Sequence, residues 1–358
     1  MLTIIRAIII VLLTVQIGLM AALILYIIRA KRAERRSKEL EARWQPLLYE
    51  YLEDEVDIKT MEIELAENYN SMWNFFRPYL DNLIGSDREK IEKLLQEIGF
   101  IAHFRQQLNS ENRSKRIRAA VVLGKVRDSV SLPQLEEMLQ SDSTYEIIIA
   151  GQAITDIGAT ELVFEIMAAF LQRTNITFEG ISQIIINYGE EICPPLITIL
   201  TDWLAGRVDL EEKFQVPAYQ SAALFVELLG HSRYQEALPV FEKILQQREN
   251  EELLIQVLKA LSRLKEPVQI DLKPFLTHEN RVIRNQTLKY LYKCCQPGYE
   301  EQIVGLLADE NWWVSFYAAM LLYHNGRQNI LTEIAGSAEQ GAAMSSYILE
   351  AGGQFEHF

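Results

Sequence analysis

The feature that most constrains the fold is a helical hairpin pattern that recurs along the chain. Its first copy, residues 114–142, reads "SKRIRAAVVLGKVRDSVSLPQLEEMLQSD" and places apolar residues at helical spacing on both sides of a turn. Gly124 ends the first expected helix. Asp128 or Ser131 caps the second, whose first turn contains Pro133. Because one such hairpin cannot bury its own apolar face, we expect further copies that stack on it.

The pattern can be followed through later segments of the chain. The position of the first glycine is occupied in turn by Gly124, Thr155, Gly189, Gly230, Ser262, Tyr292 and Tyr323. Successive positions are 30 to 41 residues apart, which is typical of helical solenoids. An incomplete copy follows near Gly352, and no alternating strand pattern interrupts the series. The sequence therefore predicts an all-α fold, a superhelix of about seven to eight hairpins over residues 110–358.

The N-terminal residues predict a membrane anchor. Residues 7–28, "AIIIVLLTVQIGLMAALILYII", are 22 uncharged and mostly apolar residues, where about 20 span a bilayer as a helix. A cleaved signal peptide is the alternative, but the run is longer than a typical signal segment and no cleavage pattern follows it. We therefore expect a single transmembrane helix in residues 1–28.

A basic segment follows at residues 29–43. Its membrane-flanking basic residues are Arg29, Lys31, Arg32, Arg35, Arg36 and Lys38. Positive residues beside a transmembrane helix stay on the cytoplasmic side and attract anionic headgroups. This pattern predicts a single-pass membrane protein whose C-terminal body lies in the cytoplasm, with the membrane as one partner.

Acidic residues dominate the rest of the chain. The formal net charge is −14, and because the basic N-terminal segments contribute +5, residues 44–358 carry −19. A body of this charge is repelled by phosphate backbones, which argues against nucleic acid as a partner. Residues 44–109 lie outside the repeats and have the pattern of an acidic, aromatic-rich helical cap. In this cap we expect Gly85 and Gly99 to end helices and Ser86 to start one with a capping box.

The sequence contains no recognisable catalytic or metal-binding constellation. It lacks the glycine-rich nucleotide signatures, a G-x-S-x-G elbow, and histidine or cysteine pairs at metal-ligand spacing. The three cysteines are an odd number and two are adjacent, which suggests a reducing compartment. We therefore expect no catalytic residue, no cofactor and no metal, and a protein that is not an enzyme.

Tryptophans supply the candidate partner-binding residues. Trp312 and Trp313 are adjacent at the start of an expected helix. Neighbours on a helix point about 100° apart, so at most one of them lies fully in the apolar stripe. One of them is therefore expected near the surface. Trp is a common interface anchor, but packing in the core or between repeats is favoured over a partner groove. Trp73, in "MWNFFRPY", is a third candidate, with the apolar seam of the cap as its alternative.

The first hairpin resembles a HEAT repeat of the short type first named from phycobilin lyases. The matching residues are Arg116, Ala119, Ala120, Leu123, Gly124, Asp128, Pro133, Leu135 and Asp142. Later copies depart from the pattern, although the arginine recurs at Arg284, eight residues before Tyr292 as Arg116 is before Gly124. The whole layout looks like bacterial membrane-anchored HEAT-repeat proteins, which implies a bacterial inner-membrane location.

The preferred hypothesis is a scaffold or adaptor that binds a protein partner with the surface built by its repeats. The resemblance implies a membrane-associated partner, such as an envelope glycosyltransferase. It also implies the alternative of a phycobilin-lyase-type enzyme or a chromophore-handling protein. A eukaryotic trafficking adaptor is a third hypothesis.

Overall fold

Every element of regular structure in the described part of the chain is a helix, which confirms the all-α prediction. The computed structural model describes residues 2–65, 69–294, 298–337 and 340–351, without the side chains of residues 2–15, 29, 30, 33, 37, 63 and 64. The chain divides into two compact units, Met1–Leu135 and Glu136–Phe358. The division falls inside α7 (Leu132–Met138).

The first unit is a bundle of helices around an aromatic core. Its helices before α7 are α1 (Leu2–Leu52), α2 (Ile58–Leu65), α3 (Tyr69–Asn82), α4 (Ser86–Glu97), α5 (Phe100–Leu108) and α6 (Arg113–Lys125). Trp44 of α1 meets Phe75 of α3 edge to face, with 5.5 Å between ring centroids, and both are buried. Gly99, in the left-handed region with φ of 75°, separates α4 from α5 as predicted.

The capping box predicted at Ser86 is wrong. Gly85, with φ of 67°, is the residue before the first turn of α4, and Ser86 is already helical. The hydroxyl of Ser86 donates to Asp87 at 3.4 Å, so it does not cap the helix. Glycine adopts this backbone conformation without steric cost, and the chain therefore enters α4 without a side-chain cap.

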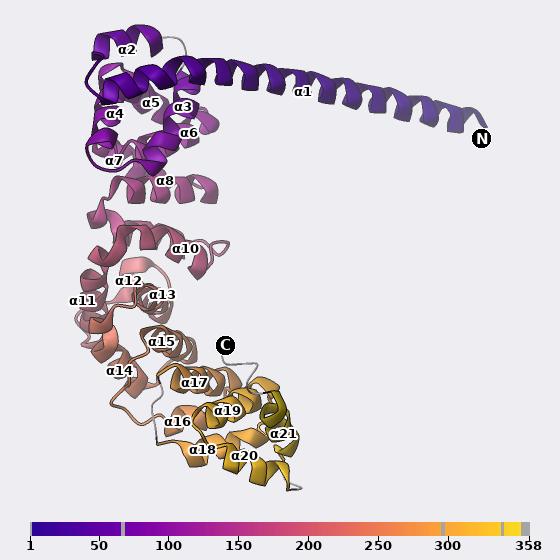
Figure 1. Cartoon of the computed structure of the whole chain (residues 1–358), viewed down its shortest axis with the longest axis vertical. Coiled ribbons are helices and arrows are strands. Elements are labelled where there is room, and N and C mark those ends of the chain that lie inside the picture. The colour runs from indigo at the N-terminus through magenta and orange to yellow at the C-terminus, as the bar shows by residue number, and fades with distance from the viewer. Residues whose placement is uncertain (1, 66–68, 295–297, 338–339, 352–358) are drawn as a thin grey trace. The chain divides into compact units, whose positions relative to one another are not determined.

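The prediction of a membrane-spanning helix is corrected by the structure. α1 is one helix from Leu2 to Leu52, and Figure 1 shows it extending well beyond the other helices of its unit. Where side chains are described, no helix is long and apolar enough to cross a membrane. In α1 these side chains begin at Gln16, which leaves 13 uncharged residues (16–28) before the basic segment, whereas about 20 are needed. Residues 7–15 of the expected span lie outside the described side chains.

The membrane as a partner and the inner-membrane location both rested on that span, and both predictions are corrected with it. The side chain of Arg29 lies outside the described residues. The other basic residues expected to flank the membrane are exposed on α1: Lys31, Arg32, Arg35, Arg36 and Lys38. Nζ of Lys38 pairs with Glu34 one turn earlier, at 2.8 Å.

The second unit is a series of helical hairpins, as the repeat pattern predicts. The paired helices are α8 (Thr144–Ile157) with α9 (Val163–Leu171), α10 (Phe178–Ile185) with α11 (Cys193–Leu204), α13 (Ala218–His231) with α14 (Leu238–Gln247), α15 (Glu251–Leu264) with α16 (Lys273–Leu276), α17 (Arg281–Cys294) with α18 (Glu300–Gly305), and α19 (Trp312–His324) with α20 (Gln328–Ala335). The incomplete last copy is α21 (Ala342–Ala351), and α12 (Leu210–Phe214) occupies the longest spacing between copies. Figure 1 shows α13, α15, α17 and α19 side by side.

Successive hairpins of this unit pack closely at small residues. Gly230 of α13 faces Ala260 of α15, and a Cβ on Gly230 would lie 2.6 Å from the Cβ of Ala260. Side chains in a close-packed interior do not approach this closely, so the missing side chain at Gly230 sets the distance between the helices. Glu227, one turn earlier, is buried in the same interface and pairs with Arg263 of α15 at 3.2 Å.

Several of the turns that lead into the first helix of a hairpin share features of their geometry. Asn112, Asn250 and Asn311 each cap the helix that follows by accepting backbone N–H bonds. Before α17, Nη1 of Arg284 donates to the carbonyls six and five residues earlier, at 2.7 and 2.8 Å. Arg116 makes the same two bonds in its own turn, each at 3.0 Å. The two arginines that are equivalent in sequence therefore close equivalent corners of the chain.

Candidate functional site

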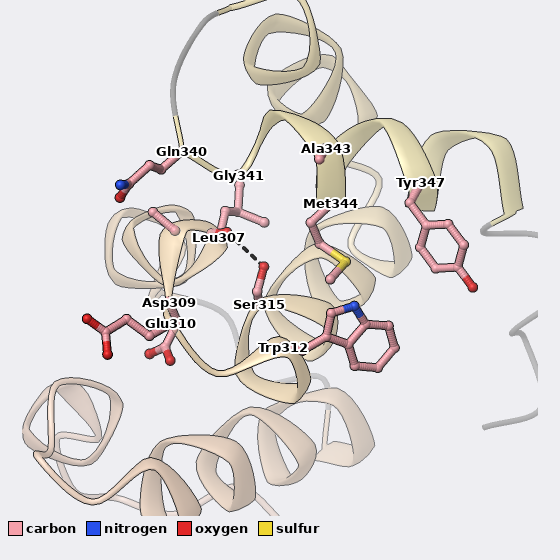
Figure 2. A pocket seen from close by; sticks show the side chains of 11 residues that line it. Leu307, Asp309, Glu310, Trp312, Ser315, Gln340, Gly341, Ala343, Met344 and Tyr347 are labelled. Atoms are coloured by element: carbon pink, nitrogen blue, oxygen red, sulfur yellow. Dashed lines mark hydrogen bonds between the residues drawn. The ribbon is translucent and has the colours of Figure 1, made fainter.

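A groove lies between α19 and α21, where the last two copies of the hairpin meet (Figure 2). Its volume is about 570 Å³. The lining residues are Leu307, Ala308, Asp309, Glu310, Trp312, Ser315, Gln340, Gly341, Ala343, Met344 and Tyr347. They come from the 3₁₀ turn η5 (Leu306–Ala308), the loop after it, the first turn of α19, the two residues before α21 and the first six residues of α21.

Trp312 is the largest side chain of the groove, and it is half exposed. Its ring lies nearly parallel to that of Phe316, with centroids 5.0 Å apart, and Trp313 meets it edge to face at 4.8 Å. Trp312 and Trp313 are 50% and 54% exposed, whereas Phe316 is buried. Figure 2 shows Met344 of α21 reaching toward Trp312, with Tyr347 farther along the same wall. An exposed aromatic ring that stacks on a buried one, as Trp312 does on Phe316, is typical of a residue that anchors a binding partner.

The turn before α19 holds these aromatic side chains in place. Asp309 accepts two hydrogen bonds from Arg284 of the preceding copy, at 2.7 and 3.0 Å, and one from the backbone N–H of Asn311, at 2.8 Å. Asn311 in turn caps α19. The hydroxyl of Ser315 donates to a carbonyl of η5 at 2.7 Å, the dashed line in Figure 2. Because these bonds fix the first turn of α19, the two tryptophans are fixed with it.

The opposite wall begins at Gly341, where α21 comes closest to η5. The φ of this residue is 104°, and a Cβ there would lie 3.0 Å from the Cβ of Leu307. Glycine is therefore required both by the backbone conformation and by the close approach. The start of α21 consequently lies tight against η5, and Met344 and Tyr347 follow in the groove wall.

The groove also carries an available negative charge. Glu310 is exposed in the lining, and no hydrogen bond or ion pair joins its carboxylate to a described residue. Asp309 beside it is already held by Arg284. The groove therefore suits an apolar side chain next to a cation. No group of His, Cys, Asp and Glu side chains able to hold a metal occurs in the part of the chain that the structure describes.

A smaller pocket of about 350 Å³ lies between the first turns of α13 and α15, three hairpins before the groove. Trp203, Tyr219 and Leu254 give it apolar surface, and Glu249 completes one side of the lining. The carboxylate of Glu249 is exposed and has no partner among the described residues. Aromatic surface and a free carboxylate are thus combined at both of these described sites.

The tryptophans singled out in the sequence have different environments. Trp312 and Trp313 contact each other, and only Trp312 lines the groove. One of the two was expected near the surface, whereas both are about half exposed. Trp73 is buried in the first unit on α3, which matches the alternative of an apolar seam in the cap. Only the first pair therefore offers surface to a partner.

The second wall of the groove was not predicted from the sequence. Met344, Tyr347 and Ile348 follow helical spacing, which indicates an apolar stripe on α21. The stripe does not tell which of its members stay open to water, because exposure depends on how neighbouring copies pack. Tyr347 is exposed and Ile348 is fully buried.

Neither protein-family models nor curated protein sequences match this chain. The groove is therefore the basis on which a function can be proposed.

Proposed function

We propose that this chain is a HEAT-like helical-repeat scaffold that binds a segment of a partner protein in the groove between α19 and α21. The observation that carries the proposal is Trp312, which is half exposed in the groove and stacked on buried Phe316. Aromatic patches open to water often mark interaction sites on soluble domains. Trp is among the residues whose truncation most often costs an interface about 2 kcal/mol or more.

The polar groups of the groove support binding over catalysis. Asp309 and Ser315 already make the hydrogen bonds that position α19, so neither is available to a reacting group. Glu310 is available, but one exposed carboxylate recognises a cation more readily than it performs chemistry. A stack of hairpins also offers a long surface without needing a catalytic pocket, which suits a scaffold.

Photo-crosslinking in the native host tests this proposal. A photoreactive residue is placed at Ala343, which is exposed in the groove, or at Glu333, which is exposed on α20 outside it. We expect one recurrent protein adduct from position 343 that is absent from position 333. The adduct should disappear when the position 343 probe is combined with Trp312→Ala.

Identical adduct patterns from the two positions would overturn the proposal, as would an adduct that survives Trp312→Ala. Circular dichroism of each variant at the working temperature shows whether the hairpin array is still folded. Trp313→Ala, at the neighbouring exposed indole that does not line the groove, is the matched control and should retain most of the adduct.

A further inference from the structure

The groove at Trp312 and the pocket at Trp203 lie three hairpins apart in the second unit, and each combines aromatic rings with an exposed carboxylate. Building on the scaffold function above, we propose that the partner segment is a basic, proline-rich peptide in the polyproline II conformation. It carries Arg or Lys at every third residue and a bulky apolar residue at each end. It lies along the first turns of α15, α17 and α19, from the smaller pocket to the groove.

Three exposed carboxylates mark this row of turns at equivalent positions of successive hairpins. Each directly precedes the asparagine that caps the next helix, and none has a hydrogen-bond or ion-pair partner among the described residues. They belong to Glu249, Glu279 and Glu310. Because the three turns have the same position in their hairpins, we infer that their carboxylates recur along one edge of the unit.

Hydrogen bonds between neighbouring turns keep the row continuous. Nδ2 of Asn280 donates to Oε2 of Glu251 at 2.6 Å, which joins the turn before α17 to the start of α15. Arg284 and Asp309 join the turn before α17 to the turn before α19, with the shortest bond at 2.7 Å. The three turns are therefore direct neighbours, in agreement with the packing of α15 against α17 and of α17 against α19 in Figure 1.

The spacing of the row selects the conformation of the ligand. Packed helices lie about 8–10 Å apart, so neighbouring carboxylates recur at roughly that interval. A polyproline II helix has 3 residues per turn and rises about 3.1 Å per residue, which brings every third side chain to the same face after about 9 Å. A β-strand puts its residues i and i+3 on opposite faces and cannot match the row in this way.

The two pockets define the ends of the ligand. From the pocket between α13 and α15 to the groove between α19 and α21 there are three helix spacings, about 27 Å, or about nine residues of polyproline II. Trp203 and Tyr219 line one end, and Trp312 and Tyr347 line the other. Aromatic-lined grooves of this kind are known to accept proline-rich segments, whose conformation is set before binding.

Charge complementarity favours a basic peptide over an acidic or phosphorylated one. Residues 248–252, 279–281 and 309–311 contain six carboxylates and two arginines, Arg248 and Arg281. The guanidinium of Arg248 lies over the ring of Phe275, 5.3 Å from its centroid. The turns therefore present a negative surface, which attracts cations and repels phosphate.

Fluorescence anisotropy of the full chain with a labelled peptide tests the inference. The probe is Trp-Arg-Pro-Pro-Arg-Pro-Pro-Arg-Trp, which reads the same in both directions and so makes no assumption about polarity. Trp-Arg-Arg-Arg-Pro-Pro-Pro-Pro-Trp has the same composition with its arginines clustered, and Trp-Glu-Pro-Pro-Glu-Pro-Pro-Glu-Trp reverses the charge. We expect the periodic probe to bind at least about fivefold more tightly than the clustered one, and the acidic probe not to bind.

Substitutions in the row give the second readout. The triple variant Glu249→Gln, Glu279→Gln, Glu310→Gln should bind the periodic probe about tenfold more weakly, since each exposed pair contributes a fraction of a kcal/mol. The matched control replaces three exposed glutamates away from the row, Glu236→Gln, Glu301→Gln, Glu333→Gln, and should change affinity by less than about twofold.

Equal affinity for the periodic and clustered probes would overturn this inference, as would equal losses in the two triple variants. A specific adduct from position 343 without binding of the periodic probe would overturn the assigned ligand while leaving the scaffold function standing. Loss of that adduct's dependence on Trp312 would remove the scaffold function itself, so the two failures are distinguishable.

Discussion

Arg284 joins two successive hairpins through Asp309: Nε donates to one carboxylate oxygen at 2.7 Å, and Nη2 donates to the other at 3.0 Å. The two side chains are 17% and 7% exposed, so water screens the pair weakly. Arg284→Ala leaves Asp309 charged and uncompensated, and we expect it to lower the free energy of unfolding by about 3 kcal/mol. Urea denaturation followed by circular dichroism measures this change.

Arg327→Ala is the matched control for that substitution. Arg327 pairs with Glu300 at 2.7 Å, but both side chains are about half exposed. An exposed pair of this kind contributes less than about 1 kcal/mol, so the control should remain close to the wild type. If Arg284→Ala and Arg327→Ala lowered the free energy of unfolding equally, the buried pair of Arg284 and Asp309 would not have the structural role given to it.

Gly230→Ala should destabilise the contact between α13 and α15. The new Cβ would lie 2.6 Å from the Cβ of Ala260 and 2.8 Å from its Cα, so the helices must move apart. We expect a loss of about 1–3 kcal/mol, measured by urea denaturation. Ala260→Gly in the same chain removes one of the two clashes and should recover part of the loss.

Gly305→Ala is the corresponding control within a helix. Gly305 is helical, and a Cβ there meets nothing within 4 Å. Replacing glycine by alanine at such a site favours the helix by about 0.5–1 kcal/mol. If Gly230→Ala were as well tolerated as Gly305→Ala, close packing at Gly230 would not set the spacing of the hairpins.

Acid should weaken the same interface through Glu227. Burial alone would raise the pKa of Glu227, but the hydrogen bond and charge of Arg263, together with His231, outweigh it and hold the pKa below its usual 4.5. The folded pKa is thus lower than the unfolded one. The carboxylate therefore stabilises the fold fully above the unfolded value, and this contribution is lost as the pH falls through the folded value.

Thermal unfolding of the wild type and Glu227→Gln from about pH 7 to about pH 3 tests this linkage. The variant should melt at a lower temperature near neutral pH, and the difference should narrow below about pH 4.5 as the wild-type carboxylate becomes protonated. A difference that stays constant over this range would show that Glu227 acts through packing and not through its charge.

Tyr290→Phe should lower the free energy of unfolding, although it removes only one oxygen atom. The buried hydroxyl of Tyr290 donates to the carbonyl of Glu266 at 2.7 Å and accepts from the N–H of Val268 at 2.9 Å. Leaving both backbone groups without this partner should cost about 1–3 kcal/mol in urea denaturation. Tyr145→Phe, at an exposed ring on α8, should change stability by less than about 0.5 kcal/mol.

The hairpin series could be predicted from the sequence because it depends on local signals. The spacing of apolar residues predicts the helices. Asparagines such as Asn250 and Asn311 cap the first helix of a new hairpin. The recurrence of Arg116 at Arg284 also corresponds to a shared geometry. Each of these signals lies within about ten residues of the feature that it predicts.

The groove and the structure of the N-terminal helix could not be predicted in the same way. The groove needs α21 to approach η5 at Gly341, and this tertiary contact leaves no periodic trace in the sequence. The apolar run that predicts a membrane span does not end as a separate element, because α1 continues through the basic residues to Leu52 and buries Trp44 and Leu48 in the first unit. The hydropathy of residues 7–28 reflects only the composition of that run, whereas the length and packing of α1 depend on all of its residues from Leu2 to Leu52.

The corner that Arg284 closes has a consequence for how such a chain can change over time. Its hydrogen bonds to the two preceding carbonyls, and those of Arg116 in its own corner, are all made within six residues of the arginine. One short segment of the gene therefore encodes both the arginine of such a corner and the residues whose carbonyls it binds. A duplication or deletion that cuts between two corners would add or remove a whole hairpin together with its own corner, so that only the contacts between hairpins, such as that of Arg284 with Asp309, would have to form again with a new neighbour.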